Sequence, residues 1–224
     1  MTTRIGLLLF PRLTQLDLTG PYEVFGRLPD AQVLLIGSGE ARSDTGLRLR
    51  PDAGYSEAPQ LDVICVPGGP GVNDAMEDEA LLRFLRAQAE RAAWVTSVCT
   101  GALVLGAAGL LRGYRATTHW LSLDLLAAFG AMPLRERVVI DRNRATGGGV
   151  TAGIDFGLRL AAELRGEKVA QSIQLLMEYD PAPPFQSGSP RTAAPELVES
   201  VSAARRGLNE ERRRIVERAA AALG

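Results

Sequence analysis

The stretch Trp94-Val-Thr-Ser-Val-Cys-Thr-Gly-Ala102 joins a short apolar run to a helical pattern, and Cys99 stands at the junction. Residues 94–98 are typical of a strand that is buried on both faces, as in a parallel sheet covered by helices. Residues 99–111 are apolar all round, which predicts a buried helix. The stretch therefore predicts a strand that turns directly into a helix, with a cysteine at the turn.

Ser97 and Gly101 flank Cys99 with small side chains, as the sharp strand-to-helix turn called a nucleophile elbow requires. The helix N-terminus would place N–H groups and partial positive charge beside the sulfur, which predicts a lowered thiol pKa. The alternative is a small buried apolar residue, the usual role of a free cysteine. Cys65, between Ile64 and Val66, lacks such a setting and is predicted to be a core residue.

The rest of the chain repeats the alternation of strand and helix. Further strands are predicted at 5–10, 32–36 and 62–66, helices at 21–28, 79–92, 121–129, 152–165 and 169–178, and hairpin or edge strands at 43–50 and 137–146. This order favours an α/β fold, a three-layer sandwich with a mostly parallel sheet, a nucleophile elbow and right-handed crossovers.

The C-terminal part differs in composition from the rest. Residues 180–190 are rich in proline and small residues and are predicted to be a loop. A helical apolar stripe follows, and its neighbouring arginines alternate with glutamates, which favours a solvated amphipathic helix over a nucleic-acid contact. We therefore expect an α/β domain at 1–180 and, at 181–224, a loop and helical extension packed on the domain or on a partner subunit.

The overall composition excludes several classes of function. The 224 residues carry a formal net charge of −1, without the basic excess that nucleic acid or an anionic membrane attracts. One histidine and two separated cysteines supply neither a zinc site nor a CxxC pair, and no phosphate-binding or dinucleotide-binding glycine motif is present. We expect no metal and no cofactor. The sparse cysteines, the lack of a signal-peptide pattern and the short apolar runs favour a cytoplasmic protein.

Asp17 is the second candidate for chemistry. It lies between two leucines, just before Thr19-Gly-Pro21, where Thr19 is better placed to cap a helix that has Pro21 in its first turn. Near the carboxyl end of the first strand, Asp17 would face the crevice in which α/β sheets bind ligands. A partly buried carboxyl near a thiol should have a raised pKa and hold a proton at neutral pH.

Two glycine-rich stretches and the single histidine complete the candidates. Pro67-Gly-Gly-Pro-Gly71 is either a plain turn or, beside Cys99, a source of N–H groups that stabilise negative charge. The Gly147–Gly149 loop is a candidate pocket wall. His119 could approach the thiol in space and act with it as a catalytic dyad. The favoured interpretation is that His119 is a hydrogen-bonded structural residue near a strand end.

Five stretches of the chain together carry a family resemblance. They are Leu16–Phe25, Val66–Gly71, Thr96–Ala102, Arg115–Trp120 and Gly147–Asp155. On these residues the chain resembles the ThiJ/PfpI superfamily, which has a class I glutamine amidotransferase-like fold. Within it, Leu175–Phe185 with Gly188-Ser-Pro190 is similar to the C-terminal region of isonitrile hydratases.

The resemblance implies hydration of a small-molecule isonitrile to an N-substituted formamide. It implies that Cys99 is the nucleophile, that Asp17 is the acid at its side, that Gly69 is the oxyanion donor and that the protein is a homodimer. The backbone N–H and hydroxyl of Thr100 would also serve the site. In this mechanism the Cys99 thiolate attacks the isonitrile carbon and Asp17 protonates that carbon, which gives a thioimidate bound to the enzyme. Water, activated by Asp17, then hydrolyses the thioimidate.

Two alternatives remain. A cysteine-dependent glyoxalase or amide hydrolase shares the fold, although those branches usually carry Cys-His at the elbow and this chain has Cys99-Thr100. The same core also resembles the ligand-sensing half of AraC-type regulators, which leaves a non-catalytic sensor or binding module, although the chain is too short for the helix-turn-helix motifs that follow in those regulators.

Overall fold

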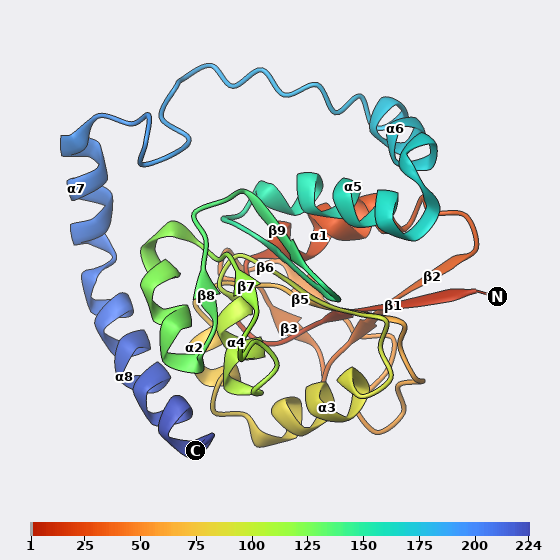
Figure 1. The fold of residues 1–224 in the computed structure, drawn as a ribbon, viewed down its shortest axis with the longest axis horizontal. Helices are drawn as coiled ribbons and strands as arrows, with labels where there is room; N and C mark the ends of the chain where they lie inside the picture. Colours follow the sequence, from red (N-terminus) through yellow and green to blue (C-terminus); the bar gives the residue numbers. More distant parts are fainter. Residues whose placement is uncertain (1) are drawn as a thin grey trace.

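The computed structural model describes residues 2–224 and contains a six-stranded sheet with helices on both faces (Figure 1). The strand order is β2-β1-β5-β6-β10-β9, in which β9 alone runs antiparallel to its neighbour. The strands are β1 (Thr3–Leu8), β2 (Ala31–Ile36), β5 (Val63–Val66), β6 (Trp94–Val98), β9 (Val138–Asp141) and β10 (Arg144–Gly147). The predicted three-layer α/β sandwich is confirmed.

Two helices cover one face of the sheet, α1 (Gln15–Phe25) and α5 (Ala152–Arg165), and they pack on each other through an edge-to-face contact of Phe25 and Phe156. On the opposite face, α3 (Glu79–Ala89) and α4 (Gly101–Ala107) pack against β5 and β6 (Figure 1). The remaining helices are α2 (Val72–Ala75), the 3-10 helix η1 (Trp120–Phe129), α6 (Glu167–Leu176), α7 (Pro195–Ala204) and α8 (Arg206–Ala222). Two-residue strands form the pairs β3 (Ala41–Arg42) with β4 (Arg48–Leu49) and β7 (Arg115–Ala116) with β8 (Met132–Pro133).

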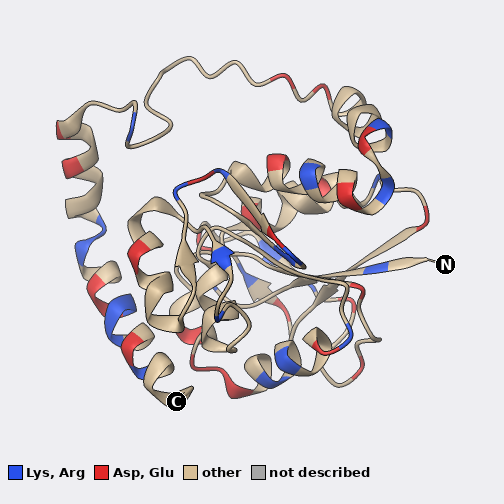
Figure 2. Cartoon of the chain, viewed as in Figure 1, with Lys and Arg blue, Asp and Glu red and all other residues tan. Residues whose placement is uncertain are grey.

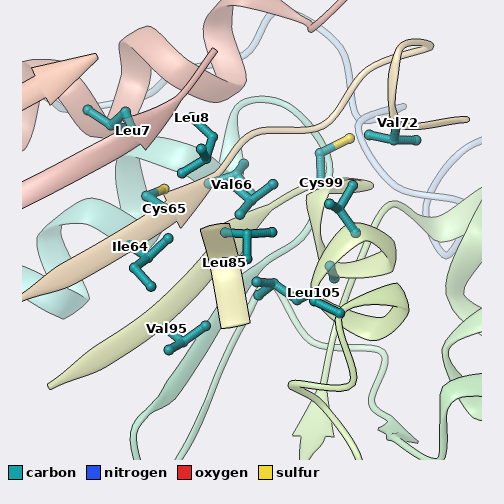
Figure 3. Packing of buried hydrophobic residues seen from close by; sticks show 14 of the residues in the cluster. Leu7, Leu8, Ile64, Cys65, Val66, Val72, Leu85, Val95, Cys99 and Leu105 are labelled. Carbon is teal, nitrogen blue, oxygen red and sulfur yellow. The ribbon is translucent and has the colours of Figure 1, made fainter. Parts of the chain in front are cut away.

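The central strands are buried on both faces, because helices cover both sides of a parallel sheet. All four residues of β5 are fully buried, and Figure 3 shows Cys65 in this strand close to Leu7, Leu8 and Ile64. The prediction that Cys65 is a core residue is therefore confirmed. All seven residues of α4 are buried too, as expected for a helix that is apolar all round, although the helix is shorter than predicted.

The first helix begins earlier than the sequence indicated. It starts at Gln15, so Asp17 lies in its first turn, Pro21 lies within it, and Thr19 caps nothing: its hydroxyl donates to Gln15 Oε1 at 2.9 Å. The cause is tertiary, because the N–H of Thr14 donates to the carbonyl of Gly68 and fixes the chain at that point. The early start carries Asp17 into the site described below.

The predicted hairpin at 137–146 is β9 and β10, and it extends the main sheet rather than standing apart.

The apolar stripe predicted near the C-terminus lies on two helices, α7 and α8, which are separated at Arg205. Ile215 and Val216 of α8 are buried, and α8 packs on η1 and α4. Figure 2 shows arginines and glutamates interleaved along α8, as predicted. Among residues 2–224 no helix combines the length and apolar character of a membrane span.

Candidate active site

A cavity of about 200 Å³ lies at the carboxyl ends of β5 and β6. Its walls come from the turns that follow these strands, from the loop after β10, and from the C-terminal helix α8. The lining residues include Gly69, Cys99, Thr100, His119, Val150, Leu208, Asn209 and Arg212. With Thr14 also in its lining, the cavity combines residues from both ends of the chain.

Cys99 stands at the strand-to-helix turn with φ at +55°, a left-handed conformation that is uncommon for a residue with a side chain. Its N–H donates to the carbonyls of Gly147 and Gly148, both at 2.9 Å, and its carbonyl accepts from Thr118 Oγ1 at 2.7 Å. A Cβ at Gly101 would lie 2.1 Å from the carbonyl oxygen of Val66. The turn is thus a nucleophile elbow, and the small residue at 101 is required by the strand beneath it.

Asp17 lies against Cys99 and is fully buried. Its Oδ2 accepts from the N–H of Gly68 at 3.1 Å, while Oδ1 has no hydrogen-bond partner among the described residues. Burial raises the pKa of Asp17 to about 7, although the Cys99 side chain and the Gly68 N–H both act to lower it. The carboxyl is therefore able to gain and lose a proton near neutral pH, as the sequence predicted.

The prediction for the thiol itself is wrong. Burial, and next the negative charge of Asp17, raise the pKa of Cys99 well above its usual range, and the N–H groups of Thr100 and Val150 only partly offset this. The partial charge of a helix terminus is small compared with desolvation and a neighbouring carboxylate. Protonation of Asp17 therefore removes one of the charges that disfavour the Cys99 thiolate.

The glycine turn after β5 is engaged within the site. The N–H of Gly68 binds Asp17, and the N–H of Gly69 donates to Thr100 Oγ1 at 3.0 Å. The N–H of Gly69, which was predicted to donate to an oxyanion, thus already has a hydrogen-bond partner. The donors that face the sulfur are instead the N–H groups of Thr100 and Val150. Val150 was not singled out from the sequence, although the adjacent Gly147–Gly149 loop was expected to form a pocket wall.

His119 lines the cavity without forming a charged dyad with the thiol. Its Nδ1 accepts from the N–H of Leu121 at 3.3 Å at the start of η1. Burial, followed by the positive charges of Arg212 and Arg205, lowers the pKa of His119 to about 4. The imidazole is thus neutral at physiological pH and hydrogen-bonded, in line with the favoured structural interpretation.

Arg212 is a further cavity residue that the sequence analysis missed. It was grouped with the solvated arginines of the C-terminal helix, yet it is only 4% exposed. A signal was present, because Arg212 lies four residues after Leu208 and three before Ile215, on the apolar stripe of the helix. A charged residue on such a stripe faces the protein interior.

A cysteine at a nucleophile elbow, a buried carboxyl against it and a mostly parallel sheet define an α/β protein with a nucleophile-elbow site. Residues 3–163 match the model of the DJ-1/PfpI family. The chain belongs to this family.

Two relatives share nearly the whole chain. An isonitrile hydratase of Pseudomonas putida is 56% identical over 225 residues, which are 100% of this chain and 99% of that protein. The crystal structure of a ThiJ/PfpI family protein from Pseudomonas syringae superposes with a TM-score of 0.94 at 42% identity, covering 96% of this chain and 91% of the other. A third relative, the helix-turn-helix transcriptional regulator GbdR of Pseudomonas aeruginosa, is 32% identical over 79% of this chain and 50% of the regulator. The alignment with the isonitrile hydratase of Pseudomonas putida covers the full chain and therefore includes the C-terminal helices.

Proposed function

We propose that this protein is an isonitrile hydratase, an enzyme that adds water to R–N≡C to give the N-substituted formamide R–NH–CHO. The observation that carries the proposal is the 56% identity to the Pseudomonas putida isonitrile hydratase over the full chain. Cys99 in the wall of a small cavity and the buried Asp17 against it support the proposal, because the reaction needs a nucleophile and a proton donor at one carbon atom.

In the first step, the Cys99 thiolate attacks the terminal carbon of the isonitrile, and protonated Asp17 delivers its proton to the same carbon. The C–S and C–H bonds form, one π bond of the isonitrile breaks, and the product is a thioimidate, Cys99–S–CH=N–R. The N–H groups of Thr100 and Val150 hold the thiolate before attack. At rest the raised pKa of Cys99 keeps this proton on sulfur, so the reacting form arises when the thiol passes its proton to the Asp17 carboxylate as the substrate binds.

In the second step, the Asp17 carboxylate takes a proton from water as the oxygen adds to the thioimidate carbon, and Asp17 then passes that proton to the nitrogen. The tetrahedral carbon now carries sulfur, OH and NHR. The hydroxyl gives its proton to Asp17 as the C–S bond breaks, which releases the formamide and restores thiolate and protonated acid. A pKa near 7 suits a group that acts alternately as acid and base.

For the organisation of the chain, we propose an α/β domain at 1–180 and a C-terminal extension at 181–224 that completes the cavity. We also propose a homodimer. The stripe of α8 is covered by the chain itself, so the support for a dimer now comes from Leu175 and Leu176 of α6, 82% and 74% exposed, and Phe185, 77% exposed. Exposed apolar side chains of this size are typical of a surface that a partner covers.

The test is incubation of the protein with a simple alkyl isonitrile while the formamide is quantified by chromatography and mass spectrometry. The proposal expects formamide from the wild type and none above background from Cys99→Ala, which removes the nucleophile. Cys65→Ala is the matched control, because it removes a buried thiol that lies outside the site. A folded wild-type protein that leaves isonitriles intact, or a Cys99→Ala variant as active as the wild type, would refute the assignment.

A further inference from the structure

Arg212 places a buried positive charge in the catalytic cavity. It comes from α8, far along the chain from the elbow, and it lines the same 200 Å³ cavity as Cys99 and Thr100. Only 4% of the residue is exposed. The mechanism proposed above uses no cation, so this charge has no assigned role.

The hydrogen bonds of Arg212 all go to neutral groups. Nε donates to Asn73 Oδ1 at 3.0 Å, Nη1 to Ser122 Oγ at 3.1 Å, and Nη2 to the carbonyl of Gly69 at 3.4 Å. Within residues 2–224 no carboxylate pairs with it. A buried charge without a partner of opposite sign is costly, and a buried ionisable group in a cleft is a candidate for a functional role.

The neighbouring residues on the helix show the contrast. Arg213 pairs with Asp124 at 2.6 Å and Arg218 pairs with Glu77 at 2.7 Å, both on the surface. These arginines of the same helix thus have ordinary carboxylate partners. Arg212 is turned inward instead, and its three hydrogen bonds fix the guanidinium in place.

The group in the same cavity that becomes an anion during the proposed reaction is the Cys99 thiol. Burial lowers the pKa of Arg212, whereas negative charge on Cys99 acts to raise it, as does Glu211 to a smaller extent. A pairwise charge interaction is reciprocal, so a guanidinium in this cavity favours the thiolate. The other charged groups around the thiol are Asp17, which opposes the thiolate, and Arg205 at the cavity wall. Asp44 also lines the cavity, and His119 is neutral.

We propose that Arg212 is a positioning residue of this site, whose guanidinium stabilises the negative charge of the Cys99 thiolate and holds the Gly69 turn in place. The C-terminal helix is then part of the catalytic apparatus, because it supplies the positive charge that the elbow lacks. The inference depends on the proposed function only in taking Cys99 as the reactive thiol, and its test uses no isonitrile.

The experiment measures the rate of Cys99 alkylation by iodoacetamide, an uncharged reagent, as a function of pH, with peptide mapping to confirm the labelled residue. All variants carry Asp17→Asn, because the charge of that carboxylate is, after burial, the next cause of the raised Cys99 pKa, and its removal lowers the midpoint. Arg212→Gln removes the charge and keeps hydrogen-bond donors, Arg212→Lys keeps the charge, and Arg213→Gln is the matched control on the exposed face.

We expect Arg212→Gln to shift the midpoint upward by about one pH unit, which corresponds to about tenfold slower alkylation at a pH below both midpoints. Arg212→Lys should stay close to the parent, and Arg213→Gln should not shift the midpoint. If the glutamine variant does not fold by circular dichroism, Arg212→Met provides a second uncharged side chain of similar length. An unchanged midpoint in a folded uncharged variant would overturn the proposal, and so would a change confined to the plateau rate, which reports access to the thiol.

Discussion

Asp17→Asn offers the sharpest test of the mechanism, because it should slow catalysis and stabilise the protein at the same time. An asparagine cannot donate a proton to the isonitrile carbon or take one from water. General acid–base catalysis contributes roughly a hundred- to ten-thousand-fold, and turnover should fall by about that factor. The helix itself should persist, because the substitution is isosteric and asparagine is compatible with the first turn of a helix.

The effect on stability follows from the raised pKa of Asp17, which moves from 3.8 to about 7 on folding. The folded state holds this proton more tightly than the unfolded chain, so the wild type loses stability as pH rises from about 4 to about 7. A shift of about three units corresponds to roughly 4 kcal/mol at pH 8. The asparagine of the variant does not titrate and escapes this cost, but its buried N–H₂ lacks an acceptor, at a penalty of about 1–3 kcal/mol.

We therefore expect the variant to be more stable than the wild type by about 1–3 kcal/mol at pH 8, and less stable by a similar amount at pH 4. The measurement is urea unfolding of both proteins at the two pH values, followed by circular dichroism, alongside formamide production at pH 8. A stability difference that does not change with pH would refute the raised pKa of Asp17. Near wild-type turnover in the folded variant would refute its role as acid and base.

Three further predictions concern the thiols, the elbow and the dimer. Brief alkylation of the native protein should label Cys99 and spare Cys65, which lies in the core, and preferential label at Cys65 by peptide mapping would contradict the site assignment. Gly101→Ala should lower the free energy of unfolding by more than about 3 kcal/mol, since its Cβ would lie 2.1 Å from the Val66 carbonyl oxygen; urea unfolding measures this, and a loss below about 1 kcal/mol would contradict it. Light scattering should return twice the chain mass of 23.9 kDa for the wild type and a smaller mass for Leu175→Glu, whereas a wild-type mass near 24 kDa would exclude the dimer.

The fold was predictable because its elements carry strong local patterns. The strands of the parallel sheet are short apolar runs, and α5 spans Ala152–Arg165, the range that the periodicity indicated. The start of α1 was not predictable in this way. Pro21 favours a helix that begins just before it, but a hydrogen bond from Thr14 to Gly68, a residue distant in sequence, sets the start six residues earlier.

The residues of the candidate site were easier to predict from the sequence than their pKa values. Cys99 and Asp17, the candidate residues that the structure brings together, were singled out from their neighbours along the chain, and the raised pKa of Asp17 was expected. The pKa of Cys99 was predicted in the wrong direction, because helix-terminus arguments are local while burial and the position of a carboxylate are tertiary. Arg212 was missed for the same reason: which arginine of a helix turns inward depends on the cavity that the rest of the fold leaves open.

The docking of α8 has a consequence in terms of effective concentration. The helix follows α7, and a long connection, Met177–Ala194, joins α7 to α6 across the edge of the molecule (Figure 1). A chain of this length, if flexible, keeps its ends on the order of 20 Å apart, which corresponds to a local concentration in the millimolar range. Hydrolysis of one peptide bond in the connection would turn closure of the cavity into a bimolecular event, so a nicked protein should lose its cavity wall on dilution although every residue is still present.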